Sequence, residues 1–181
     1  ADASFEKWME KKEYKKLSGE SIPRNGLQAL FNFDKANLAD ALHPRKIGSM
    51  RRESGPGERP VYEKRDKGKA LVLNGDSWLD MDTVGVFRRS EPFSIGIWVN
   101  IPEDLKEGVI FHNSISERLY NYRGYHLYLK DNKLELSMAH TAPSDAITKL
   151  TTENIPRDQW IQLTVTYDGS SKAKGYRLFL D

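Results

Sequence analysis

Aromatic and basic side chains gather in one short stretch of the sequence, SERLYNYRGYHLY, over residues 116–128. Aromatic rings supply apolar area on which a sugar or a peptide can stack, and neighbouring Arg and Asn side chains supply directional hydrogen bonds. Trp78, beside an Asn-Gly turn, offers the same chemistry. The alternative is that these side chains only support the local structure. The candidate ligand-binding residues are Arg118, Tyr120, Tyr122, Arg123 and Trp78.

Two carboxylates could contribute to a cation site. Asp80 and Asp82, in the sequence DMD, would share one face of a strand, because side chains two residues apart point the same way. Hard oxygen donors suit calcium, but two carboxylates are too few for its coordination shell. An ordinary surface pair is the simpler interpretation. We predict no metal centre, with Asp80 and Asp82 as the only candidates for binding calcium.

The remaining reactive side chains give no support for catalysis. His126 and His140 should point to opposite faces of a predicted hairpin, and we interpret His112 as a packed or hydrogen-bonded residue and His43 as a loop residue. Neither NGDSW nor YDGSS is a G-x-S-x-G turn that exposes a nucleophile. The chain has no Cys, which excludes a disulfide framework, a thiolate zinc site and haem attachment through C-x-x-C-H. We predict no cofactor in this chain.

The composition limits the size and the partners of the domain. With 181 residues, 38% of them hydrophobic, the chain can bury one sizeable core, which favours a single domain. The 28 Lys and Arg nearly balance the 26 Asp and Glu, so nothing favours nucleic acid or an anionic membrane as a partner. No apolar run approaches the ~18 residues of a membrane-spanning helix, and the first residues lack a signal-peptide pattern.

The first third of the chain is polar and rich in turn residues. Apolar residues at helical spacing predict a short amphipathic helix over 5–16, and LQALFNF predicts a first strand over 27–33. The stretch 45–69 has little periodicity and holds nine Lys or Arg against four Asp or Glu. This composition indicates a solvated surface loop, with a basic ligand-facing loop as the alternative.

From Ala70 onward the apolar residues follow a period of two, which is typical of β-strands. KALVLNGDSWLDM indicates two short strands around a tight turn at Asn74-Gly75. FSIGIWVN carries apolar side chains on both faces, which predicts a strand covered on both sides. We expect Trp98 and Trp160 to pack in the core or against a sheet.

The segment YHLYLKDNKLELSMAH, residues 125–140, predicts a β-hairpin. If Asp131 and Asn132 form a two-residue turn, Lys130 lies opposite Lys133. A slip by one residue would place apolar side chains opposite polar ones along the whole ladder. The register pairs Leu129 with Leu134, Leu127 with Leu136 and Tyr125 with Met138 on one face, and leaves His126, Tyr128, Glu135 and Ser137 on the other.

Two more alternating segments, WIQLTVTYDG and YRLFLD, are joined by a polar loop. About nine short strands separated by turns, with one helix, predict an all-β fold, an antiparallel β-sandwich or jelly roll.

Five segments in order resemble the laminin G-like, concanavalin A-like lectin/glucanase superfamily. They are GKALVLNGDSWLDM, EPFSIGIWVN, GVIFHNS, RGYHLYLKDNKLELSM and IPRDQWIQLTVTYDGSSKAKGYRLFLD, and LFNFD is similar to the family's entry strand. The resemblance covers about residues 27–181, so that 1–26 would be a helix and linker from a preceding region. The chain is most similar to modules inside large exported bacterial proteins that also carry a cytochrome c-like segment.

This resemblance implies a non-catalytic recognition or scaffolding module, periplasmic, extracellular or on the cell surface. It would bind carbohydrate or a neighbouring domain of the same parent protein, and any haem would lie elsewhere in that parent. The alternative is a glycan-active hydrolase of the same fold. Glucan-cleaving members of the superfamily carry an E-x-D-x-x-E strand, and this sequence has none.

The family pattern continues beyond Asp181 with two to four further strands. We therefore expect the sandwich to be incomplete at its C-terminal end, where an unpaired edge would favour association with another strand or chain.

Overall fold

The computed structural model describes residues 25–53, 57–65, 68–114 and 123–181, and in these it is all-β with one 3₁₀ turn, η3 (Ala173–Gly175). The helix predicted over 5–16 lies outside the described residues. The chain divides into two compact units, one ending at Val84 and one running from Gly85 to Asp181, and each is described by itself. No helix among the described residues is long and apolar enough to cross a membrane.

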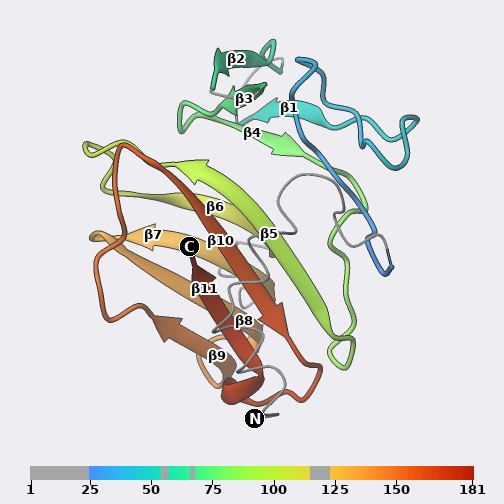
Figure 1. Cartoon of the computed structure of the whole chain (residues 1–181). Helices are drawn as coiled ribbons and strands as arrows, with labels where there is room; N and C mark the ends of the chain where they lie inside the picture. Colours follow the sequence, from blue (N-terminus) through green and yellow to red (C-terminus); the bar gives the residue numbers. More distant parts are fainter. Residues whose placement is uncertain (1–24, 54–56, 66–67, 115–122) are drawn as a thin grey trace, which may run out of the picture. The chain divides into compact units, whose positions relative to one another are not determined.

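The first unit contains two antiparallel ribbons of two strands each (Figure 1). In one ribbon β1 (Ser49–Arg52) pairs with β4 (Ser77–Asp80), and in the other β2 (Val61–Lys64) pairs with β3 (Lys69–Val72). The two strands predicted around Asn74-Gly75 are thus confirmed in position, since they are β3 and β4. They do not pair with each other, however, because each has its own partner from the preceding stretch.

The prediction of a strand over 27–33 is wrong, because the structure has no strand there. The backbone of Leu30 pairs with a loop instead: its N–H donates to the Asp40 carboxylate at 2.9 Å, and its carbonyl accepts from Ala41 N–H at 2.7 Å. Phe33 then takes a φ of 55°, which ends the extended run. The apolar alternation of this segment therefore does not lead to a β-ladder.

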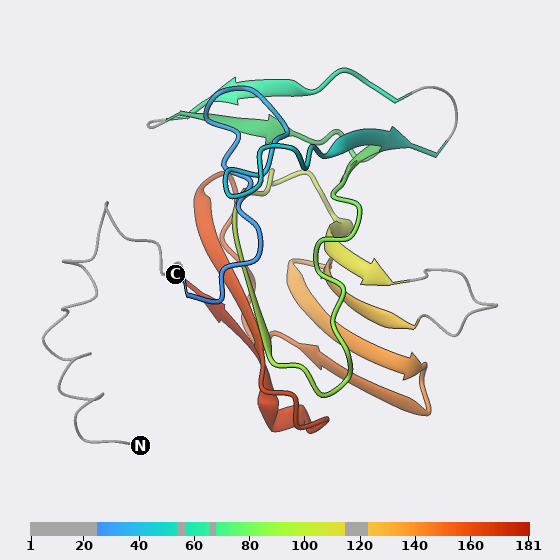
Figure 2. The same ribbon diagram turned by 90° about the vertical axis from the view of Figure 1, so that its right-hand side faces the viewer.

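The second unit is a sandwich of two antiparallel sheets, seen as two layers in Figure 2. The four-stranded sheet has the order β6-β7-β8-β9, and the three-stranded sheet has the order β11-β10-β5. The strands of the first sheet are β6 (Glu107–Ser114), β7 (Gly124–Lys130), β8 (Lys133–Thr141) and β9 (Asp145–Leu150). Those of the second are β5 (Phe93–Asn100), β10 (Trp160–Tyr167) and β11 (Tyr176–Leu180).

The core lies between these two sheets. Leu127 and Leu134 of the four-stranded sheet and Val165 of the three-stranded sheet are completely buried in one apolar cluster. Each such side chain contributes about 1.5–3 kcal/mol relative to an exposed position. The cluster draws on both sheets, and this shared core holds the two layers together.

The predicted hairpin is confirmed residue by residue. β7 and β8 pair in the predicted register, from Lys130 opposite Lys133 to Tyr125 opposite Met138. Asp131 and Asn132 have φ values of 47° and 63°, as a two-residue turn of this hand requires. The turn and the apolar face therefore specify the same register.

The expectation that β5 is covered on both sides is wrong. Phe93, Ile95, Ile97 and Val99 point into the core, whereas the alternate residues of the strand are exposed. Trp98 and Trp160 are 50% and 39% exposed, so neither is a core residue. Among the described residues β11 is an edge strand, with Phe179 half-exposed. The predicted strands beyond Asp181 stay a prediction.

Candidate functional site

The structure describes two of the five ligand-binding residues predicted from the sequence. Arg118, Tyr120 and Tyr122 lie outside the described residues. Arg123 directly precedes β7, and its Nη2 lies 2.9 Å from Nε2 of His140. Trp78 lies on β4 and is 44% exposed. Arg123 and Trp78 belong to different units of the chain.

Trp78 lies on an exposed face of the β1–β4 ribbon together with charged side chains. The register places Arg51 opposite Trp78 and Ser49 opposite Asp80, so that all four point to the same side. Arg51 Nε lies 3.5 Å from Asp80 Oδ2. An indole ring beside an ion pair combines apolar area with directional polar groups.

Asp80 and Asp82 do not share a strand face, contrary to the expectation from DMD. Asp80 ends β4, whereas Asp82 lies in the following turn with a φ of 54° and donates its N–H to Asp80 Oδ1 at 2.9 Å. The Asp80 carboxylate thus supports the turn and pairs with Arg51. The described part of the chain holds no cluster of three His, Asp or Glu side chains suited to a metal ion.

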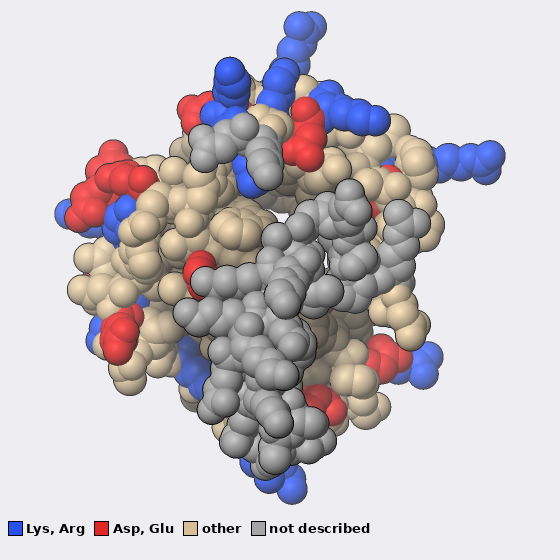
Figure 3. Space-filling model, viewed as in Figure 1, with Lys and Arg blue, Asp and Glu red and all other residues tan. Residues whose placement is uncertain are grey.

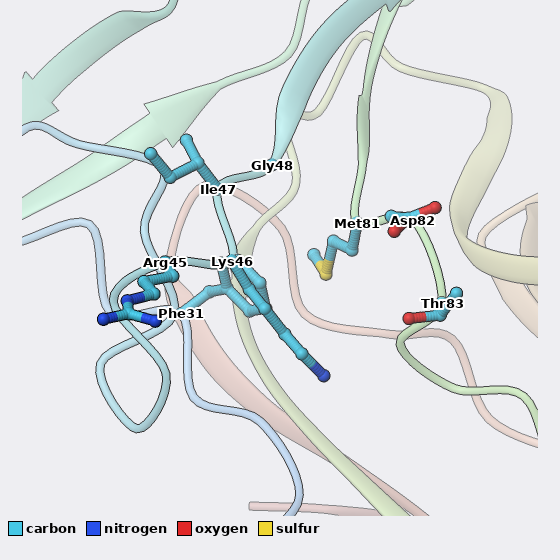
Figure 4. A pocket seen from close by; sticks show the side chains of 8 residues that line it. All are labelled: Phe31, Arg45, Lys46, Ile47, Gly48, Met81, Asp82 and Thr83. Carbon is cyan, nitrogen blue, oxygen red and sulfur yellow. The ribbon is translucent and has the colours of Figure 1, made fainter.

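A cavity of about 220 Å³ opens where the β1–β4 ribbon ends (Figure 4). The residues just before β1 form one wall with Phe31, and the residues just after β4 form the other. Lys46 extends into the opening between the two walls, and Met81 approaches it from the opposite side. The lining residues are Phe31, Arg45, Lys46, Ile47, Gly48, Met81, Asp82 and Thr83.

Asp40 holds the loop that carries the cationic wall. Its completely buried carboxylate accepts N–H bonds from Leu30 and Leu42 at 2.9 Å each, and its Oδ2 lies 2.8 Å from His43 Nδ1. Burial acts to raise the pKa of Asp40, but the bonds from Leu30, His43 and Leu42 together outweigh burial and leave that pKa below its usual value. The loop is therefore fixed by an ionised, fully hydrogen-bonded carboxylate.

Basic side chains project from the surface of this first unit, as Figure 3 shows in blue. Some of them are paired: Arg52 binds Asp76 and Glu58, and Arg51 binds Asp80. No ion pair among the described residues involves Arg45 or Lys46. Lys46 therefore extends into the cavity without an ion pair to any described residue.

A second surface, which we name the aromatic face, is the outer side of the β5–β10–β11 sheet. Trp98, Trp160 and Phe179 expose 50%, 39% and 51% of their surface there. The register decides which polar residues lie among them: Gln162 is opposite Trp98, and Thr164 lies between Gly96 and Phe179. The face consists of Ser94, Gly96, Trp98, Asn100, Trp160, Gln162, Thr164, Thr166, Arg177, Phe179 and Asp181, which exchanges backbone hydrogen bonds with Gln162.

Sheet geometry gives the scale of the aromatic face. Trp98 and Trp160 are diagonal neighbours with Cα atoms roughly 7–8 Å apart. Trp98 and Phe179 lie two strands and one side-chain row apart, roughly 12 Å between Cα atoms. A Cβ on Gly96 would meet only the Thr164 hydroxyl, at 4.0 Å, so the glycine leaves space beside that hydroxyl. The face is a shallow platform longer than one sugar ring.

Carboxylates lie on the other sheet. On the outer side of the four-stranded sheet Tyr128 lies opposite Glu135, whose Oε1 is 3.2 Å from His126 Nε2. Burial is the largest cause that raises the pKa of Tyr128, and the charge and hydrogen bond of Glu107 raise it further. By contrast, none of β5, β10 and β11 contains an Asp or Glu.

The four histidines have separate partners. His43 binds Asp40, His126 binds Glu135, His140 lies against Arg123, and His112 contacts the backbone of Ser114. These contacts are hydrogen bonds within single loops or between neighbouring strands.

The aromatic face was not predicted from the sequence. One signal could have revealed it: Gln162, Thr164 and Thr166 alternate with apolar residues, which marks one face of β10 as outward. In the structure β5 pairs with β10 and places Trp98 on that same face, but the sequence does not show that β5 is the partner of β10.

Comparisons with known proteins agree with this architecture. Domain 4 of AbnA, a GH43 extracellular arabinanase from Geobacillus stearothermophilus solved in complex with arabinotriose, has a similar structure with a TM-score of 0.62. The two are 22% identical over 84% of this chain and 69% of that chain, a likeness of fold. A comparison with curated proteins found no match. The laminin G-like family profile described as the concanavalin A-like lectin/glucanases superfamily matches residues 73–181, well over half of the sequence, and the chain therefore belongs to that superfamily.

Proposed function

We propose that this chain is a non-catalytic carbohydrate-binding module of an exported, multidomain bacterial protein, and that the aromatic face binds a neutral saccharide chain. The observation that carries the proposal is the grouping of Trp98, Trp160 and Phe179 on one outward sheet face, with amide and hydroxyl side chains between them.

The composition of the aromatic face fits sugars. Sugar rings present C–H surfaces that pack on aromatic rings, and their hydroxyls need both donors and acceptors. Gln162 and Thr164 offer both, and they are centred among the rings. Among the described residues the register places two charged side chains on the face, Arg177 and, opposite Gln162, Asp181; their opposite charges balance, which favours a neutral ligand over a charged one.

The similar structure supports the same class of ligand, because that arabinanase domain was solved with an arabinose trisaccharide. The predicted setting, an exported parent protein with a cytochrome c-like segment, remains part of the proposal. A neighbouring domain of that parent is the other partner the family resemblance implies.

The proposal that the module lacks catalysis rests on where the acids lie. Glycosidases that use two carboxylates hold them on either side of the scissile bond. The three strands beneath the aromatic face contain no Asp or Glu, and Glu107 and Glu135 lie on the opposite sheet. Asp181, directly after β11, places a single carboxylate opposite Gln162. A ligand on the aromatic face would have no carboxylate pair from these strands.

Glycan-array screening followed by calorimetry tests the proposal. We expect binding of a neutral oligosaccharide, and Trp98→Ala should weaken it about 3- to 10-fold, the value of one aromatic stacking contact. Gly96→Val should weaken it as well, by covering the Thr164 hydroxyl with a residue that suits a strand. Trp78→Ala is the matched control, since it removes an exposed indole from the other unit and should leave affinity unchanged.

Two results would contradict the proposal. If the array shows no neutral glycan bound, the module is better described as a structural spacer or protein-docking domain. If the wild-type chain releases reducing sugar from a bound glycan, and Glu107→Gln or Glu135→Gln abolishes the release, the hydrolase alternative is correct.

A further inference from the structure

We propose that the cavity at the end of the β1–β4 ribbon is a second saccharide site, which takes an acidic sugar and binds its carboxylate through Lys46. This goes beyond the proposed function, since the cavity lies in the first unit and selects a charged ligand where the aromatic face selects a neutral one.

Lys46 is placed by a tight turn. Lys46 N–H donates to the His43 carbonyl at 2.8 Å, which closes a turn with Pro44 in its second position, as such turns favour. Asp40 fixes both sides of this turn, through its carboxylate on His43 and its own N–H, which donates to the Lys46 carbonyl at 2.9 Å. The cationic wall is thus preorganised, which reduces the entropy lost on binding.

Lys46 and Arg45 carry no ion pair among the described residues, in contrast to Arg51 and Arg52 on the neighbouring strand. Figure 4 shows Lys46 reaching into the opening, whereas the Arg45 guanidinium lies on the side of Phe31 away from Met81 and Thr83. Because Lys46 forms no ion pair with a described residue, an anion can bind to it without breaking one.

The opposite wall decides which anion fits. Asp82 carries a negative charge there, which disfavours a dianion such as phosphate but accepts hydrogen bonds from hydroxyl groups. Thr83 can donate or accept beside it, while Phe31 and Met81 offer apolar area to the C–H surface of a ring. A single carboxylate on a hydroxyl-rich ring, as in a uronic acid, matches all of these groups.

The size of the cavity agrees with a single ring. About 220 Å³ is below the roughly 300–1,000 Å³ of pockets that enclose drug-sized ligands. The opening therefore suits one terminal or branching sugar residue, with the remainder of a glycan outside.

A heteronuclear NMR titration of the full chain with glucuronate and with galacturonate tests this inference. We expect the backbone amides of Lys46, Gly48 and Thr83 to shift with a millimolar Kd. Glucose, galactose, acetate and phosphate should each bind at least about 5-fold more weakly. Raising the salt concentration from about 50 to 500 mM should weaken uronate binding, because the contact is an ion pair.

The decisive variant is the double substitution Arg45→Gln with Lys46→Gln, which should weaken uronate binding about 5-fold or more. The matched control is Lys64→Gln with Lys69→Gln, which removes the same charge from the exposed β2–β3 ribbon and should leave binding unchanged. If both double variants lose the same uronate affinity, the loss is an effect of overall charge, and the inference is overturned. Equal affinity for acetate and uronate would overturn the assignment to a sugar.

The proposals for the two sites can be refuted independently of each other. Trp98→Ala should leave uronate binding intact, and the Arg45 and Lys46 variant should leave neutral-glycan binding intact. Absence of any uronate-induced shift in wild-type protein would overturn this inference without affecting the aromatic face.

Discussion

Asp40 is the residue whose replacement tests the construction of the first unit most directly. Asp40→Asn keeps the shape of the side chain and an Oδ1 that can still accept from Leu30 and Leu42, but it removes the charge. Asp40→Ala removes both acceptors and leaves two amide groups of the loop without their partner. The comparison separates the value of the charge from that of the hydrogen bonds.

The magnitudes follow from the contacts of the carboxylate. A hydrogen bond to a charged group contributes about 1.5–3 kcal/mol and one between neutral groups about 0.5–1.5 kcal/mol. In Asp40→Asn two backbone N–H groups donate to a neutral amide oxygen in place of a carboxylate. This change should lower the free energy of unfolding by about 2 kcal/mol. Asp40→Ala should cost about 3–5 kcal/mol, because each unsatisfied buried N–H adds its desolvation penalty.

The difference between wild type and Asp40→Asn should depend on pH in one direction. The pKa of folded Asp40 lies below its unfolded value of about 3.9, so folding favours the charged form. The extra stability is therefore fully present above about pH 4 and is lost as the pH falls through the lower pKa of the folded protein. The stability advantage of the wild type over Asp40→Asn should therefore shrink as the pH falls below 4.

Native-state hydrogen exchange at the amides of Leu30 and Leu42 is the suitable assay, since it reports on this loop rather than on the sandwich of the second unit. Urea unfolding of each variant between pH 3 and 8 supplies the overall free energy. Two outcomes refute the reasoning: Asp40→Asn and Asp40→Ala costing the same, or a wild-type advantage over Asp40→Asn that is as large at pH 3 as at pH 7.

Further expectations concern the second unit. Gly85 has a φ of 81°, and a Cβ there would lie 2.6 Å from the hydroxyl oxygen of Tyr125, which donates to the Gly85 carbonyl. Gly85→Ala should therefore lower the free energy of unfolding, measured in urea, by about 2 kcal/mol. The loss should be smaller in a Tyr125→Phe background, which lacks that hydroxyl. Burial raises the pKa of Tyr125 to about 12, so folding favours the neutral phenol. The free energy of unfolding should therefore fall as the pH rises from about 10 through 12, and it should fall less steeply in Tyr125→Phe. Asp131→Gly should stabilise the hairpin by up to about 1 kcal/mol in thermal unfolding, because Asp131 has a φ of 47°, whereas Asp131→Val should destabilise it.

The hairpin of β7 and β8 could be predicted completely because its information is local. The turn residues Asp131 and Asn132 select a two-residue loop, and the alternation on both strands then leaves one register that buries every Leu. Turn chemistry and hydrophobic pattern lie within one short segment, so no distant part of the chain was needed to decide between alternatives.

The strand expected over 27–33 failed for the opposite reason. Its apolar alternation resembles that of β10, but a strand forms only where another strand supplies hydrogen bonds. Here the partner of Leu30 is the Asp40 side chain together with Ala41, a contact between two loops that no periodicity reveals. In the same way the break between two strands at Asn74-Gly75 was evident from the sequence, while the pairing of β3 with β2 and of β4 with β1 was not.

The aromatic face shows why a binding surface can be absent from a correct fold prediction. β5 carries Phe93, Ile95, Ile97 and Val99 on one side and Trp98 on the other, so its sequence alone does not say which side is outward. The answer comes from β10, whose Gln162 is opposite Trp98 and whose buried Leu163 is opposite Ile97. A Trp among Ser, Gly and Asn therefore became a surface residue only once its partner strand was known. Sheet pairing thus determines where the candidate ligand surface lies, and substitutions that preserve the pairing, such as Gly96→Val, are the ones that can test it.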